Sequence, residues 1–159
     1  MILKNSPISY VREVVKDDTE RLYVFSDNGD RSSGKGLIPD DSEYSIRFKK
    51  KGLHFPSRTT ALIRGLQNAY PVTTQKRYVP GIHSYAGNWN DKDFEKFKKV
   101  IDDDFEHIKN ACKEKGYKEI IFPRSGILNG GISRITSDRT PKLFTYIVQK
   151  EIELKEFEP

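Results

Sequence analysis

The chain has 159 residues and a mass of 18.4 kDa, is 35% hydrophobic and 32% charged, and carries a formal charge of +5. This length predicts one domain, and the composition excludes the disordered, collagenous and disulfide-rich classes. Because no run reaches the roughly 18 apolar residues of a membrane span and the N-terminus is too polar for a signal peptide, we expect a cytoplasmic protein without a membrane partner.

The first third of the chain contains one clear strand. Residues 21–26 predict a short buried strand, because apolar, β-favouring residues run together there and then stop at residues 26–30, which are turn-forming. Residues 8–15 are expected to form a second strand that pairs with it. Residues 31–56 follow no regular period and predict a long, basic insertion loop within a single domain of residues 1–159.

The middle of the chain predicts a short helix and another strand. Ser57 or Thr59 can cap a helix that runs through Arg64, and Gly65 ends it. Residues 70–74 are then expected to form a buried strand.

The clearest helix is predicted for residues 91–115, with Asn90 as its cap and Gly116 as its end. A buried strand is expected at residues 118–122. A last helix begins after Thr140. Its expected buried residues are Leu143, Phe144, Ile147, Val148 and Ile152.

The alternation of strands, loops and helices predicts the α/β class, with one layered domain around a mostly parallel or mixed central sheet. If the three internal strands are parallel, the loops that follow them meet at the carboxyl edge of the sheet. Ligands of open α/β sheets bind at that edge. The three loops comprise residues 27–36, 74–89 and 124–133.

These loops hold the residue types that bind phosphate. Glycines let backbone N–H groups approach an anion, while arginine, lysine, asparagine and threonine side chains donate hydrogen bonds to it. A purely structural glycine turn or Asx turn remains an alternative. The candidate nucleotide-binding and phosphate-binding residues are Asn28, Arg31, Gly34, Lys35, Gly36, Thr74, Lys76, Arg124, Ser125, Gly126, Asn129, Gly130 and Gly131.

Positive charge is concentrated in one segment. Residues 45–90 carry eight basic and no acidic side chains, interleaved with aromatic residues. This mixture is typical of contacts with a nucleotide or a nucleic acid. The alternative is a solvated loop that keeps the protein soluble, which would suffice to explain Lys49, Lys50 and Lys51.

Several other chemistries lack their usual residues. The single cysteine, Cys112, and the spacing of the three histidines predict neither a disulfide nor a zinc site, so we expect no metal and no cofactor. No nucleophile elbow and no catalytic carboxylate pair occurs. A general base at neutral pH could be His54, His83 or Asp27, and the sequence does not rank them.

Much of the chain resembles an uncharacterised family of small bacterial and bacteriophage proteins. Its members have a strand of the "VFGDN" type, a glycine-rich turn, an Arg-Gly-x-x-Asn-Ala segment and a late glycine loop. The resemblance spans roughly residues 20–155 and rests on residues 22–28, Arg31, Gly34, Gly36, 63–69, 71–76, 123–132 and 139–146.

The order of strands and glycine loops is in turn similar to that of macrodomains, which bind ADP-ribose and in some branches hydrolyse ADP-ribosyl bonds. This resemblance implies a macrodomain-like fold in which Asp27 and Asn28 face the adenosine or the distal ribose. It also implies that residues 125–131 surround the diphosphate. Macrodomains usually have a run of three glycines after the asparagine, whereas this chain has only Gly34 and Gly36 there.

The leading hypothesis is therefore a macrodomain-like domain that binds an ADP-ribose-type or other phosphorylated nucleotide. Catalysis is left open: a hydrolase would act on ADP-ribosyl or nucleotide phosphate bonds, with Asp27 as the catalytic residue that orients water. The alternative is a non-enzymatic, phage-like binding or inhibitor protein in the host cytoplasm. Such a protein would contact nucleic acid or an acidic host protein through residues 45–90.

Overall fold

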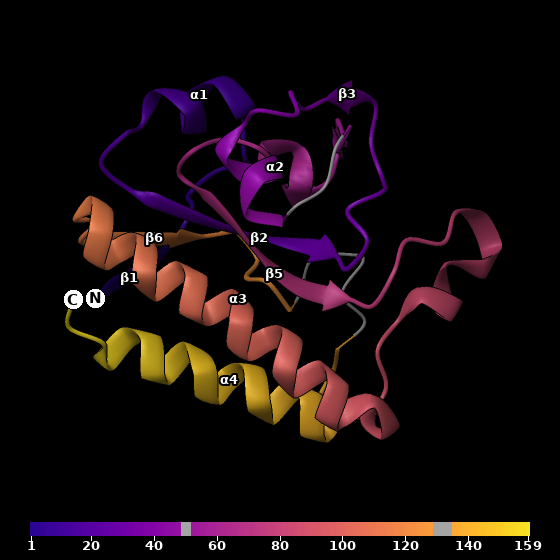
Figure 1. The fold of residues 1–159 in the computed structure, drawn as a ribbon. Helices are drawn as coiled ribbons and strands as arrows, with labels where there is room; N and C mark the ends of the chain where they lie inside the picture. Colours follow the sequence, from indigo (N-terminus) through magenta and orange to yellow (C-terminus); the bar gives the residue numbers. More distant parts are fainter. Residues whose placement is uncertain (49–51, 129–134) are drawn as a thin grey trace.

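The computed structural model describes residues 1–48, 52–128 and 135–159. Its centre is a four-stranded sheet in the order β1, β6, β2, β5, and every neighbouring pair is parallel (Figure 1). The strands are β1 (Ile2–Asn5), β2 (Leu22–Asn28), β5 (Ala69–Gln75) and β6 (Glu119–Phe122). The predicted α/β class with a mostly parallel sheet is confirmed, as are the three internal strands.

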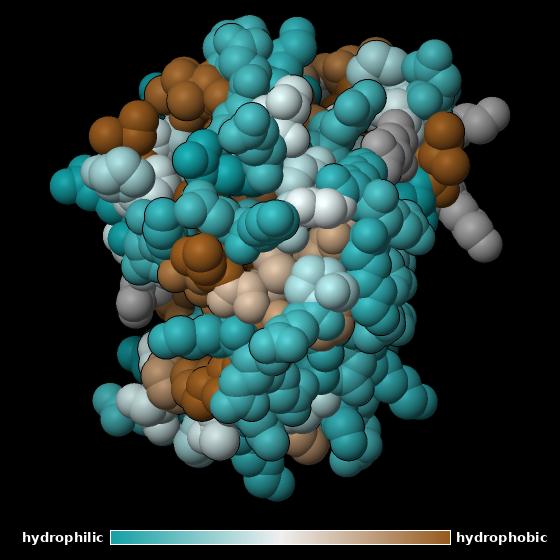
Figure 2. All heavy atoms as spheres, turned by 90° about the vertical axis from the view of Figure 1, so that its left-hand side faces the viewer, coloured by the Kyte–Doolittle hydropathy of each residue, from teal (hydrophilic) through white to brown (hydrophobic). Residues whose placement is uncertain are grey.

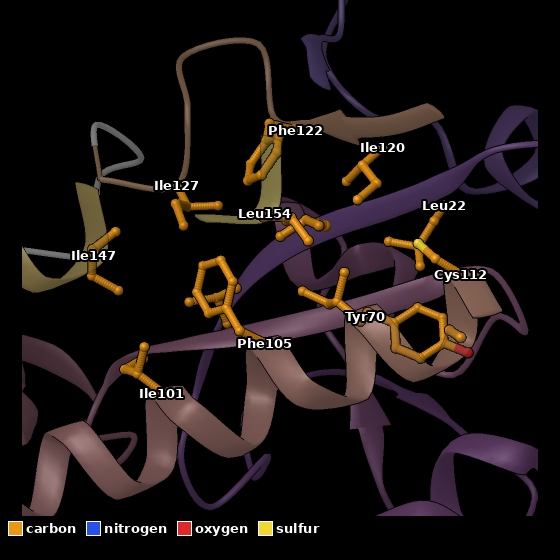
Figure 3. Close-up of a cluster of buried hydrophobic side chains, with 14 of the residues drawn as sticks. Leu22, Tyr70, Ile101, Phe105, Cys112, Ile120, Phe122, Ile127, Ile147 and Leu154 are labelled. Carbon is orange, nitrogen blue, oxygen red and sulfur yellow. The ribbon is translucent and has the colours of Figure 1, made fainter. Parts of the chain in front are cut away.

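Two helices, α3 (Phe94–Lys115) and α4 (Pro141–Glu156), cover one face of the sheet (Figure 1). Their apolar side chains meet those of β2, β5 and β6 in the larger core. Figure 3 shows part of this cluster, with side chains from helices and strands pointing toward one another. Fully buried members include Leu22, Ile101, Ile108, Ile120, Ile127, Ile147 and Leu154.

The ends of α3 follow from local chemistry. The Asn90 side chain accepts a hydrogen bond from the Lys92 N–H, and Asp93 completes a capping box over one 3₁₀ turn before the helix begins. Gly116 ends α3 in the left-handed region, with φ of 75°. The predicted cap and the predicted end are therefore confirmed. On α4, by contrast, Ile152 is 53% exposed, so the expectation that it is buried was wrong.

The other face of the sheet carries short elements. They are the helices α1 (Arg12–Asp17) and α2 (Glu43–Phe48), the 3₁₀ helix η1 (Thr60–Ile63), and an antiparallel pair of strands, β3 (Gly36–Leu37) and β4 (His54–Phe55). They enclose a second core around Phe25, Tyr44 and Ile63. Residues 31–56, which were predicted to form a loop, thus contain the helix α2 and the antiparallel strands β3 and β4.

The expected strand at residues 8–15 was wrong, because this segment leads into α1 instead. Strand β2 already has β6 and β5 on its two sides, which leaves no position for another partner. In α1, Val15 is buried whereas Val11 and Val14 are about half exposed. The second neighbour of β6 is β1, which the sequence did not reveal.

Side chains protect the free edge of β5. The Thr73 N–H donates to Asp104 Oδ2 at 2.7 Å, and the Trp89 indole N–H donates to the Thr73 carbonyl at 3.0 Å. These two bonds satisfy backbone groups that an edge strand would otherwise offer to another chain. They also fix α3 and the segment before it against the carboxyl half of β5.

Replacing Phe97 by alanine tests the packing of α3. Phe97 is fully buried and its ring packs edge-on against Trp89, with centroids 5.5 Å apart. We expect Phe97→Ala to lower the free energy of unfolding by about 3–5 kcal/mol, because a cavity replaces the ring. Urea unfolding measures this change. The control Lys98→Ala, at an exposed position of the same helix, should stay within about 0.5 kcal/mol of the parent. Similar losses for both variants would contradict the packing.

Candidate functional site

Asp27, the second-last residue of β2, and Arg64, the residue after η1, form a buried ion pair. Asp27 is 4% exposed at the carboxyl end of the strand, and Arg64 is 0% exposed. Arg64 Nε donates to Asp27 Oδ2 at 2.9 Å, and Nη2 donates to Oδ1. The two parallel bonds make a bidentate pair, which is the strongest common form of an ion pair in proteins.

The same guanidinium organises the inserted segment. Arg64 Nη1 donates to the carbonyl of Ser33 at 2.7 Å, to that of Arg31 at 3.2 Å, and to that of His54. These carbonyls lie on both sides of the excursion that leaves β2 and returns through β4. Arg64 therefore connects the two ends of the insertion to the carboxyl end of β2.

Two further groups surround the Asp27 carboxylate. The Tyr44 hydroxyl donates to Oδ2 at 3.0 Å, and burial raises the pKa of Tyr44, so the hydroxyl stays protonated as a donor. Arg31 Nε lies 3.5 Å from the same oxygen, while its Nη2 donates to Thr73 Oγ1 at 3.1 Å. Both oxygens of Asp27 are thus engaged. This arrangement favours a structural role, and the water-orienting role stays a prediction.

A second acid lies behind Arg31. Asp104 Oδ1 is 3.9 Å from Arg31 Nη2, and Asp104 Oδ2 accepts the hydrogen bond from Thr73 described above. Burial raises the pKa of Asp104 to about 6, because desolvation outweighs the attraction of Arg31 and the hydrogen bond. Arg31 therefore bridges two buried carboxyl groups.

A cavity of about 470 Å³ opens beside this cluster at the carboxyl edge of the sheet. Its walls come from the end of β2, residues 33–35, residues 56–61, the end of β5 and Tyr78. In Figure 1 the arrowheads of β2 and β5 mark this edge. The predicted site residues that it brings together are Asp27, Asn28, Gly34, Lys35 and Thr74.

The opposite edge of the sheet looks different. Figure 2 shows the face at the left of Figure 1, where the two chain ends lie. Hydrophilic side chains cover most of this face, and hydrophobic ones form small separate patches. The described parts of the polar loops that the sequence singled out follow the carboxyl ends of the strands, on the other side.

Some predicted residues lie elsewhere. Arg31 belongs to the buried ion cluster, and Gly36 packs so closely on the Phe55 ring that a Cβ atom there would come within 2.2 Å of it. Lys76 Nζ pairs with Asp93 at 3.4 Å. These three serve packing or internal charge balance in this structure.

The remaining predicted residues are divided between a second cavity and the undescribed part of the chain. Arg124, Ser125 and Gly126 line a neighbouring cavity of about 480 Å³. Asn129, Gly130 and Gly131 lie outside the described residues.

Sequence reasoning missed the charged residue that the two cavities share. Arg58 is exposed, lines both cavities, and has no hydrogen-bond or ion-pair partner among the residues that the structure describes. Gln75 and Tyr78 also line the first cavity without having been assigned to it. The sequence signal that could have found these residues is their position within residues 45–90, which contain no acidic side chain. That segment also contains many residues that bond internally, so position in it does not separate the two groups.

The cationic segment is used mostly inside the protein. Arg64 is buried, Arg47 lies 4.3 Å from the Tyr70 ring centroid, and Lys76 has its acidic partner. Arg58 and Arg77 are exposed. The lysines at positions 49–51 lie outside the described residues.

The first cavity has a positive balance. The only acidic side chain among its described lining residues is Asp27, whose charge Arg64 neutralises. Lys35 and Arg58 line the same cavity, and no described residue pairs with either side chain. Thr74 is fully buried, and its hydroxyl has no hydrogen-bond partner within the described part of the chain. The cavity thus has two unpaired cations on its wall, Lys35 and Arg58.

Two other searches concern the described residues only. Residues 1–48, 52–128 and 135–159 contain no cluster of three or more acidic, histidine or cysteine side chains that could hold a metal ion. Over the same ranges, no helix has both the length and the apolar character that crossing a membrane requires.

Comparison with known families gives one match. Residues 7–150 match the model of a family of unknown function, DUF7831. The chain belongs to this family. The expectation that the chain belongs to an uncharacterised family is confirmed to this extent. The match does not support the resemblance to macrodomains or to bacteriophage proteins. No curated protein and no solved structure matches the chain.

Removing the charge of Arg64 should destabilise this DUF7831 protein strongly. We expect Arg64→Met to lower the free energy of unfolding by about 3–5 kcal/mol, because a buried carboxylate loses its main partner. Adding Asp27→Asn to that variant should restore part of the loss. Urea unfolding of the single and double variants measures both effects, with Arg77→Met as the exposed control. A loss below about 1 kcal/mol for Arg64→Met would contradict the central role of the pair.

The raised pKa of Asp104 predicts a pH dependence of stability. Its pKa of about 6 in the folded state lies above the ordinary value of 3.8, so the folded state binds the proton more tightly. The contribution of this group to stability is therefore full below pH 4 and is lost as pH rises through 6. Between pH 4 and pH 7, the free energy of unfolding of the Asp104→Asn variant should rise relative to that of the parent by on the order of 2–3 kcal/mol. Urea unfolding at both pH values tests this, and an unchanged difference between the two proteins would refute it.

Proposed function

We propose that this protein binds a phosphorylated nucleotide, of the ADP-ribose type or another, in the cavity at the carboxyl edge of β2 and β5. The volume of about 470 Å³ falls in the usual range of small-molecule sites. The observation that carries the proposal is the pair of cations on its wall, Lys35 and Arg58, which no described residue pairs with.

Each of these groups suits a phosphate or a ribose. Lysine and arginine donate charge-assisted hydrogen bonds to phosphate oxygens. At the rim, Tyr78 is 43% exposed, and its ring offers a surface on which a base can stack.

Hydrolysis is not part of this proposal. Asp27, the predicted catalytic residue, has both carboxylate oxygens engaged by Arg64 and Tyr44. Its contribution to binding is indirect: it neutralises Arg64, which in turn holds the segment that contains Lys35 in place.

The alternative, a binding or inhibitor protein that uses residues 45–90, has less support. Three of the five described cations in that segment, Arg47, Arg64 and Lys76, have internal partners. The segment therefore presents less positive charge to a partner than its composition indicates.

Calorimetric titration with adenosine, AMP, ADP and ADP-ribose tests the proposal. We expect at least one phosphorylated ligand to bind below millimolar concentration and adenosine to bind more weakly. Arg58→Ala should weaken binding by about tenfold or more, because a charge-assisted hydrogen bond is lost.

The matched control is Arg77→Ala, which removes an exposed cation that does not line the cavity. Its affinity should equal that of the parent. If none of the phosphorylated ligands binds at millimolar concentration, the proposal is wrong.

A further inference from the structure

The second cavity extends the first along the same edge of the sheet. Its volume is about 480 Å³, and its wall includes Pro123 and Arg124, which follow β6, as well as Ser9 and Tyr10. Arg58 and Thr59 line both cavities. The two cavities, each large enough for a small ligand, therefore adjoin, and the exposed Arg58 lies at their shared boundary.

Unpaired cations are distributed evenly over the two cavities. Lys35 lines only the first, Arg124 lines only the second, and Arg58 lines both. No described residue forms a hydrogen bond or an ion pair with any of the three side chains. The described lining of the second cavity contains no acidic residue. Each cavity thus has its own cation, and the boundary has one more.

We propose that the two cavities take two consecutive nucleotides of a short single-stranded nucleic acid, with the linking phosphodiester at Arg58. This inference rests on the proposed function and names its substrate class. A nucleic-acid strand carries one phosphate for each nucleotide, so its phosphates alternate with its ring systems. The three cations alternate with the two cavities in the same way. A pyrophosphate that joins two groups would place its charge at the boundary alone and leave Lys35 and Arg124 without an anion.

The polar groups of the second cavity fit this class. Ser9 and Ser125 are exposed and offer hydroxyl donors to a sugar or a phosphate. The Tyr10 hydroxyl is already used, because it donates to the carbonyl of Val24 at 2.7 Å and also to that of Ile121. Recognition in this cavity therefore depends mainly on the cation and the hydroxyls, which suits binding that tolerates different bases.

Calorimetry with three ligands tests the inference. These are AMP, the 5′-phosphorylated dinucleotide pApA, and ADP-ribose, whose two halves are joined by a pyrophosphate. We expect pApA to bind at least about tenfold more tightly than AMP, and more tightly than ADP-ribose. Arg124→Ala should remove most of the gain for pApA while leaving the affinity for AMP within about twofold of the parent.

Salt dependence provides a second readout. For pApA, Arg124→Ala should reduce the slope of log K against log salt concentration by about 0.7, because one phosphate contact is lost. Arg139→Ala, which removes an exposed cation that lines neither cavity, should leave both the affinity and the slope unchanged.

The possible failures are distinguishable. If AMP binds but pApA binds no more tightly, or if Arg124→Ala weakens both equally, the two-cavity inference is wrong and the nucleotide site stands. Tighter binding of ADP-ribose than of pApA would likewise overturn the inference and leave the proposed function in place. If neither these three ligands nor ADP binds at millimolar concentration, both proposals fail.

Discussion

The buried pair between Asp27 and Arg64 is the interaction on which the rest of the structure depends. Burying two charges costs more than their attraction returns unless the remaining donors are also satisfied. Here Arg64 gives its other donors to the carbonyls of Ser33, Arg31 and His54. One side chain from the segment after η1 thereby joins the end of β2 to both ends of the insertion, and the first cavity lies against the structure so formed.

This pair also explains how much of the fold the sequence could reveal. Strands β2, β5 and β6 and helices α3 and α4 were predictable, because their apolar residues repeat at strand or helix spacing and their ends carry caps or glycine. The pair β3 and β4 was not, because each strand has only two residues and the carbonyls beside them are held by Arg64, a contact that only the tertiary structure reveals. Helix α1 was mistaken for a strand because six residues are too few for periodicity to separate the two.

The candidate site was predictable in its place and less so in its members. The parallel order of the strands brought the loops to one edge, as expected, and Asn28, Lys35 and Thr74 meet there. Whether a cation is free or paired is a property of tertiary structure, so sequence could not separate Arg58 from Arg31. In the sequence, an arginine that belongs to a buried ion cluster cannot be distinguished from an arginine at the rim of a cavity.

Arg64 holds the insertion in place, and amide hydrogen exchange of an Arg64→Lys variant tests this role. Lysine keeps the charge but cannot bond to the carboxylate and the carbonyls together. The informative amides are those of Lys35 and Ile38, which donate to the carbonyls of Phe55 and Leu53. We expect their protection to fall by about tenfold or more while protection within α3 stays close to that of the parent. Unchanged protection at both amides would contradict it.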